Sequence, residues 1–141
     1  MTTTTDHAAM LRRVPLFAAM TDAAYERVAE IAELRQLTAG QTVTAQGDEG
    51  DAFYILVDGV AEVRRDDRPI RALQPGDFFG EIALLDGRPR SATVVATTDL
   101  RLLRIAREQF LRLFDEQPAT RHGILMALTE RIRNDAPHPT D

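Results

Sequence analysis

The spacing of hydrophobic positions first indicates a helical segment, from Ala8 to Leu37, with a break at Pro15. Within it, four apolar residues recur at helical spacing on one face: Tyr25, Val28, Ile31 and Ala32. Thr21 or Asp22 is the expected N-cap, because either side chain can accept hydrogen bonds from the first backbone amides of a helix. The pattern predicts an amphipathic helix that ends near Leu34.

After this helix the spacing changes to short β-rich runs that extend to Ile105 and alternate with turn sequences. The runs are Thr42–Thr44, Ala52–Val57, Val60–Arg64, Ile70–Leu73, Ala92–Ala96 and Leu100–Ile105. The turns carry Gly40 and the sequences QGDEGD, DG, DDRP, QPGD and DGRPR. Many short strands with frequent turns predict a β-barrel or a double-sheet jelly roll.

The helical period returns after Arg107, and two further helices are expected. The first has the apolar positions Phe110, Leu111, Leu113 and Phe114. The second follows Pro118, which suits the first turn of a helix, and has the apolar positions Ile124, Leu125, Leu128 and Ile132. The last eight residues contain two prolines and are expected to be a tail.

The length and composition fit one globular domain. The chain has 141 residues, of which 44% are hydrophobic and 28% charged. A net charge of −5 argues against a domain that covers the phosphates of nucleic acid or lies on an anionic membrane, so neither is an expected partner. The absence of cysteine excludes disulfides and thiolate metal sites. No signal peptide or long apolar segment is present, which predicts a cytoplasmic location.

The stretch FGEIALLDGRPRSATV, residues 79–94, carries the candidate chemistry. If a helical turn begins near Ile82, the amides of Gly80 to Ala83 are unpaired and can bind an anion. Arg90, ten residues after Gly80, has a planar guanidinium that suits phosphate oxygens. Glu81 only accepts hydrogen bonds when ionised, which suits a sugar hydroxyl. Together these residues indicate a site for a phosphorylated ribose.

This stretch resembles the phosphate-binding cassette of the cyclic nucleotide-binding domain family, in its Gly80-to-Arg90 spacing and in the residues around the arginine. The sequences VPLF, QGDEGDAFYILVDGVAEV and LQPGDFFGE also resemble that family. The resemblance implies a mainly β fold, an eight-stranded antiparallel β-roll (jelly roll) flanked by N-terminal helices and two C-terminal helices. It covers residues 10–133, which leaves residues 1–9 as a flexible head and 134–141 as a disordered tail.

The resemblance also implies the ligand and the roles of six residues of the cassette. The ligand is cyclic AMP or cyclic GMP, and no other cofactor is expected. Ser91 favours cyclic AMP, because guanine preference in the family often comes with a threonine at this place. Glu81 is expected to bind the ribose 2′-hydroxyl and Arg90 the cyclic phosphate. The remaining ligand contacts are expected from the amides near Gly80, Ile82 and Ala83, and from Ser91 against the phosphate or the base.

The last helix is expected to act as a lid. In the bacterial cyclic-nucleotide-gated channel sensors, whose cassette this one resembles, an arginine of the final helix covers the purine, and an ungapped match places it on Arg131. The alternative is a solvated Arg131 paired with Glu130. The apolar side of this helix could equally pack permanently or form a dimer contact.

Other interpretations explain less of the sequence. Glu81 and Arg90 could form only a structural ion pair. The acidic stretch from Asp48 to Asp51 lacks the spacing of an EF-hand and is expected to be a solvated turn. The three histidines are far apart in the sequence, and a triad of Ser91, His122 and Asp99 lacks a nucleophile turn. We therefore expect no catalytic residue, no metal site and no enzyme.

The expected function is a regulatory module of signal transduction that binds a cyclic nucleotide and signals to an unidentified protein partner. Transcription regulators with this sensor carry a helix-turn-helix of about 70 further residues, and only eight residues follow Arg133, so direct DNA binding is not expected. The alternative is a protein-interaction domain that keeps the fold without a ligand.

Overall fold

The structure, a computed structural model, describes residues 4–13, 22–80, 88–116, 118, 121–122 and 125–126. Two helices come first, α1 (Thr4–Arg12) and α2 (Asp22–Ile31). Eight strands follow: β1 (Glu33–Leu37), β2 (Thr42–Thr44), β3 (Ala52–Asp58), β4 (Ala61–Arg65), β5 (Arg68–Leu73), β6 (Phe78–Phe79), β7 (Thr93–Ala96) and β8 (Leu100–Ala106). Helix α4 (Arg107–Glu116) begins directly after the last strand.

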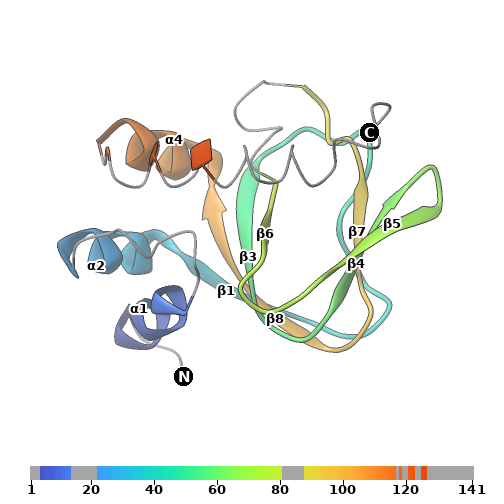
Figure 1. Ribbon diagram of the computed structural model, residues 1–141, viewed down its shortest axis with the longest axis horizontal. Coiled ribbons are helices and arrows are strands. Elements are labelled where there is room, and N and C mark those ends of the chain that lie inside the picture. Colours follow the sequence, from blue (N-terminus) through green and yellow to red (C-terminus); the bar gives the residue numbers. More distant parts are fainter. Residues whose placement is uncertain are drawn as a thin grey trace.

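The eight strands form two antiparallel sheets, with the strand orders β1-β8-β3-β6 and β2-β7-β4-β5. In Figure 1 the sheets face each other, and α1, α2 and α4 lie together on the outer side of the first sheet. This arrangement confirms the predicted mainly β, double-sheet fold with eight strands.

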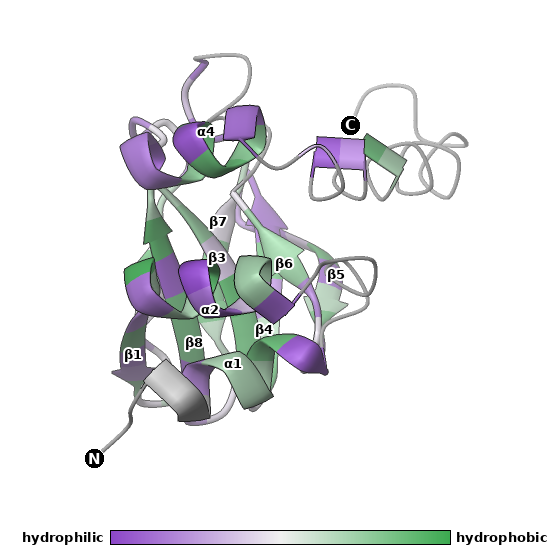
Figure 2. Cartoon of the chain, turned by 90° about the vertical axis from the view of Figure 1, so that its left-hand side faces the viewer, coloured by the Kyte–Doolittle hydropathy of each residue, from purple (hydrophilic) through white to green (hydrophobic). Residues whose placement is uncertain are grey.

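Strand β3 is buried on both faces and divides the hydrophobic core in two. Phe53 and Ile55 pack with the helices, whereas Tyr54 and Leu56 point between the two sheets. Because alternate residues of a strand point to opposite faces, an unbroken apolar run is needed where both faces are covered. Figure 2 shows β3 and β8 largely hydrophobic, with hydrophilic positions gathered on the outer sides of α2 and α4.

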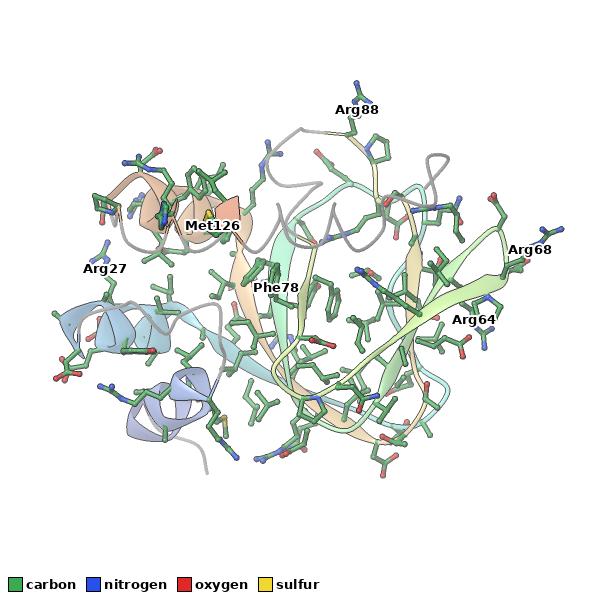
Figure 3. The ribbon with its side chains drawn as sticks, in the orientation of Figure 1. Arg27, Arg64, Arg68, Phe78, Arg88 and Met126 are labelled. Atoms are coloured by element: carbon green, nitrogen blue, oxygen red, sulfur yellow. The ribbon has the colours of Figure 1, made fainter. Side chains whose placement is uncertain are left out.

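Helix α4 is tied to the first sheet and to α2. The Phe110 ring is 1% exposed and stacks on Phe53 with 4.8 Å between ring centroids. Arg27 of α2 points toward α4 (Figure 3) and forms a 3.1 Å ion pair with Glu116. The helix therefore closes over the outer face of β3.

Six predicted strands lie within two residues of their observed bounds, but two short strands were not predicted. The prediction that the helix ends near Leu34 was wrong, because α2 ends at Ile31 and residues Glu33–Leu37 form β1. This segment pairs along its whole length with Leu100–Arg104 of β8, and that pairing outweighs the local helical pattern. Strand β6, only two residues long, pairs with Tyr54 and Ile55.

Several boundaries predicted from the sequence remain predictions. Helix α1 begins at Thr4, within the segment expected to be a flexible head. The first expected C-terminal helix is α4, whereas most of the second, like the VPLF sequence, lies outside the described residues. Within the described ranges, none of the helices combines the length and the apolar character needed to cross a membrane.

Replacing Phe110 with alanine is expected to lower the free energy of unfolding by about 3–5 kcal/mol, because it removes a buried ring that α4 places on Phe53. Urea denaturation measures this loss. Ile70→Ala is the control, because Ile70 is 39% exposed, and its expected loss is about 1 kcal/mol or less. Equal losses in the two variants would contradict the role of Phe110 in docking the helix.

Candidate functional site

Among the described residues, Arg90 is the charged residue that is buried, and only 6% of its surface is exposed. It precedes β7, and the loop between β2 and β3 holds its backbone. The Arg90 amide donates to the Asp48 carbonyl at 2.8 Å, and the Gly47 amide donates to the Arg90 carbonyl at 2.9 Å. These two bonds fix the point from which the side chain enters the roll.

The Arg90 guanidinium lies at the start of β3. Its Nη2 donates to the Ala52 carbonyl at 2.7 Å and lies 3.7 Å from Oδ1 of Asp51. The guanidinium carbon lies 5.8 Å from the centroid of the Tyr54 ring, which stacks on Phe79. These contacts offset part of the free energy needed to bury the charge.

The second terminal nitrogen of Arg90, Nη1, is buried and has no hydrogen-bond partner among the described residues. It lies against Gly80, where an added Cβ would be 2.5 Å from Nη1 and 2.8 Å from the Ala52 carbonyl. Gly80 also has a φ of +93°, which disfavours any residue with a side chain. A buried guanidinium with a free N–H face can hold an anion, because hydrogen bonds between charged groups are strong.

A second arginine, Arg104 of β8, also lies close to the carboxylate of Asp51. Its Nη2 is 3.5 Å from Oδ2 of Asp51, and its Nη1 is 3.5 Å from Oε1 of Glu33. Burial lowers the pKa of Arg104, but a hydrogen bond to Tyr54 and the negative charges of Asp51 and Glu33 outweigh it and raise the pKa overall. Arg104 is therefore charged at any physiological pH.

The seven predicted ligand-binding residues fall in two groups. Gly80, Arg90 and Ser91 are described, and Gly80 and Arg90 are in direct contact. Ser91 is exposed, and its carbonyl accepts a hydrogen bond from Nε of Arg65 at 3.2 Å. The other four lie outside the described residues: Glu81, Ile82, Ala83 and Arg131. The ligand contacts of all seven remain predictions, as does the alternative ion pair between Glu81 and Arg90.

The residues around Arg90 were not found from the sequence. Asp51 was interpreted as a solvated turn residue, and its side chain is 68% exposed, yet its two oxygens face two arginines. One signal was available for Arg104. Arg104 lies two residues after Leu102 and four after Leu100, and both leucines point between the sheets. Because every second residue of a strand points to the same face, this position predicts that the Arg104 side chain lies inside the roll.

Two of the residues considered for metal binding or catalysis, Asp99 and His7, have other partners. Asp99 accepts a hydrogen bond from the Ala39 amide at 2.9 Å, and Nδ1 of His7 lies 3.1 Å from the Ala29 carbonyl. Among the residues that the structure describes, no three His, Asp or Glu side chains are grouped to hold a metal ion.

The fold is a β-roll that holds a buried arginine, whose Nη1 has no hydrogen-bond partner among the described residues. The sequence profile of the cyclic nucleotide-binding domain family matches residues 34–117, more than half of the chain. The chain belongs to this family, as the resemblance of its cassette predicted.

Curated relatives include two fungal proteins named cAMP-dependent protein kinase regulatory subunit. The protein from Aspergillus fumigatus is 41% identical over 107 residues, which cover 74% of this chain and 26% of that protein. The protein from Aspergillus niger is 38% identical over 107 residues, with the same coverage. The chain thus spans about a quarter of the length of these relatives.

Solved structures share the fold over most of the chain. The structure of cAMP-bound PfPKA-R (141–441) is 30% identical with a TM-score of 0.82, and the match covers 93% of this chain and 45% of that one. The Thermus thermophilus catabolite activator protein is 31% identical with a TM-score of 0.79, with 86% and 60% coverage. A regulatory subunit of a cAMP-independent protein kinase A from Trypanosoma brucei, at 20% identity and a TM-score of 0.80, shows the fold alone.

Gly80→Ala is expected to destabilise the fold more than Gly40→Ala. Both glycines have nearly the same φ, +93° and +92°, so the backbone strain of an alanine, about 1–2 kcal/mol, is common to both. Only at Gly80 does the added methyl group meet Arg90 and Ala52, since nothing lies within 4 Å of a Cβ at Gly40. Urea denaturation of the two variants measures the difference, and equal losses would contradict the close contact at Gly80.

Proposed function

We propose that this chain is a sensor module that binds cyclic AMP inside the β-roll, with Arg90 paired to the cyclic phosphate. The observation that carries the proposal is the buried Nη1 of Arg90, which lies against Gly80 without a hydrogen-bond partner among the described residues. The proposal is supported by the names of the fungal relatives and by the cAMP-bound state of the PfPKA-R structure.

The charge distribution favours an anionic ligand at Arg90. The chain carries a net charge of −5, so an anion is repelled on average and needs a local cation. Arg90 supplies that cation where water is largely excluded, and there a phosphate oxygen gains more from a charged donor than it does at the surface. The competing carboxylate of Asp51 is 3.7 Å away, a weaker contact than a direct hydrogen bond.

The other ligand contacts follow the family resemblance. Glu81 accepts a hydrogen bond from the ribose 2′-hydroxyl, while the amides of Gly80, Ile82 and Ala83 donate to the phosphate. Ser91 lies against the phosphate or the base, and cyclic AMP is the preferred ligand, with cyclic GMP as the alternative. None of these residues has a catalytic role, and the module acts by binding.

The signal passes to a protein partner through the C-terminal segment. Relatives of this chain are regulatory subunits of protein kinases, and a kinase catalytic subunit is therefore the class of partner that we propose. The helix after Pro118 moves onto the roll when the nucleotide binds, and Arg131 covers the purine. The module works in the cytoplasm without contact to nucleic acid or membrane.

Calorimetric titration with cyclic AMP and cyclic GMP tests the site. Arg90→Ala removes a charge-assisted bond of roughly 1.5–3 kcal/mol and is expected to weaken cyclic AMP binding about 10- to 150-fold. Arg64→Ala is the control, because Arg64 projects from the β4–β5 hairpin into solvent (Figure 3) and pairs with Glu62, so it should bind as the wild type does. Wild-type affinity in Arg90→Ala would refute its phosphate role. Failure of the wild type to bind either nucleotide would favour the ligand-free interaction domain.

Arg131→Ala tests the lid. A guanidinium stacked on a purine is worth about 0.5–2 kcal/mol, so cyclic AMP affinity should fall roughly 2- to 30-fold, mainly through faster dissociation. Stopped-flow displacement of a fluorescent cyclic AMP analogue measures the dissociation rate, with Arg133→Ala as the control that keeps the wild-type rate. An unchanged rate in Arg131→Ala would exclude it as the residue that covers the base.

A further inference from the structure

The carboxylate of Asp51 lies between two guanidiniums. Its Oδ1 is 3.7 Å from Nη2 of Arg90, and its Oδ2 is 3.5 Å from Nη2 of Arg104. Neither distance is that of a short hydrogen bond, so the carboxylate is shared by the two cations and belongs fully to neither. Asp51 is also 68% exposed, which leaves it able to shift toward one cation when the other is removed.

Arg104 is held in place independently of Arg90. It lies opposite Tyr54 on β3 and opposite Glu33 on β1, the two strands that flank β8. It lies 3.5 Å from Glu33, and only 20% of its side chain is exposed. Arg104 therefore keeps its position beside Asp51 whether or not an anion occupies Arg90.

We propose that Arg104 is a positioning residue that holds part of the charge of Asp51 and thereby leaves Arg90 available to the phosphate of the ligand. This inference rests on the proposed function. A bound phosphate and the Asp51 carboxylate compete for the same guanidinium, so affinity for the phosphate rises as Asp51 is neutralised by another cation. Arg104 acts through Asp51 and does not contact the nucleotide.

A double-mutant cycle separates this role from direct attraction of the anion. Arg104→Gln is expected to weaken cyclic AMP binding about 2- to 5-fold, the scale of a partly exposed ion pair. Asp51→Asn removes the competitor, so Asp51→Asn/Arg104→Gln should bind as tightly as Asp51→Asn alone. If Arg104→Gln weakens binding equally in both backgrounds, Arg104 attracts the anion directly and the inference is wrong.

Two further variants serve as controls. Arg101→Gln removes the same charge from the same strand, but Arg101 pairs with Asp58, so wild-type affinity is expected. Arg104→Lys keeps a cation beside Asp51 and should restore most of the affinity. Loss of binding in both Arg104 variants, with folding intact by circular dichroism, would point to a need for the guanidinium shape and would contradict the proposed role of charge.

Arginine-selective NMR of the nucleotide-free protein tests the same contact without a ligand. In Arg104→Gln, Asp51 should hold Arg90 more tightly, so the exchange of the Arg90 guanidinium protons with water should slow at least about 2-fold, in line with the affinity change. Adding Asp51→Asn should abolish the slowing. An unchanged exchange rate in Arg104→Gln would overturn the inference. Slower exchange in Arg104→Gln, together with a wild type that binds no cyclic nucleotide, would refute only the proposed function.

Discussion

A guanidinium buried inside a β-roll is the constraint on which the site depends. Arg90 keeps only 6% of its surface exposed, and a buried charge destabilises the fold unless nearby groups compensate it. Those groups are the carbonyl of Ala52, the carboxylate of Asp51 and the ring of Tyr54. Ala52 and Tyr54 belong to the start of β3, and Asp51 directly precedes it. Because β3 is packed on both faces, its rigidity determines where the N–H groups of Arg90 point.

The same few residues also connect the site to the helices. The carbonyl of Asp51 accepts a hydrogen bond from the amide of Arg107, the first residue of α4, at 2.9 Å. Two residues further along, Phe53 stacks on Phe110 of that helix. A change in the contact between Arg90 and Asp51 therefore acts on a segment that also anchors α4. This short path links the proposed phosphate position to α4.

Local sequence patterns predicted the strands with alternating or continuous apolar residues. The cassette resemblance assigned Gly80 and Arg90 to one site, but the direct contact between them was not predicted. Residues whose position depends on distant pairing were missed. Glu33–Leu37 is a strand only because β8 lies beside it, and Ala52 is 38 residues from the arginine that it binds. Such contacts exist only after the sheets have formed. The roles of Glu81 and Arg131 remain predictions, because they lie outside the described residues.

The most direct test is a crystal structure of the chain with cyclic AMP. The phosphate is expected within about 3.2 Å of Nη1 of Arg90, the ordinary range of a charged hydrogen bond. Nη2 should keep its bond to the Ala52 carbonyl, since that bond fixes the guanidinium before the ligand arrives. A nucleotide bound with its phosphate away from Arg90, or an Nη1 that remains unpaired beside it, would contradict the account.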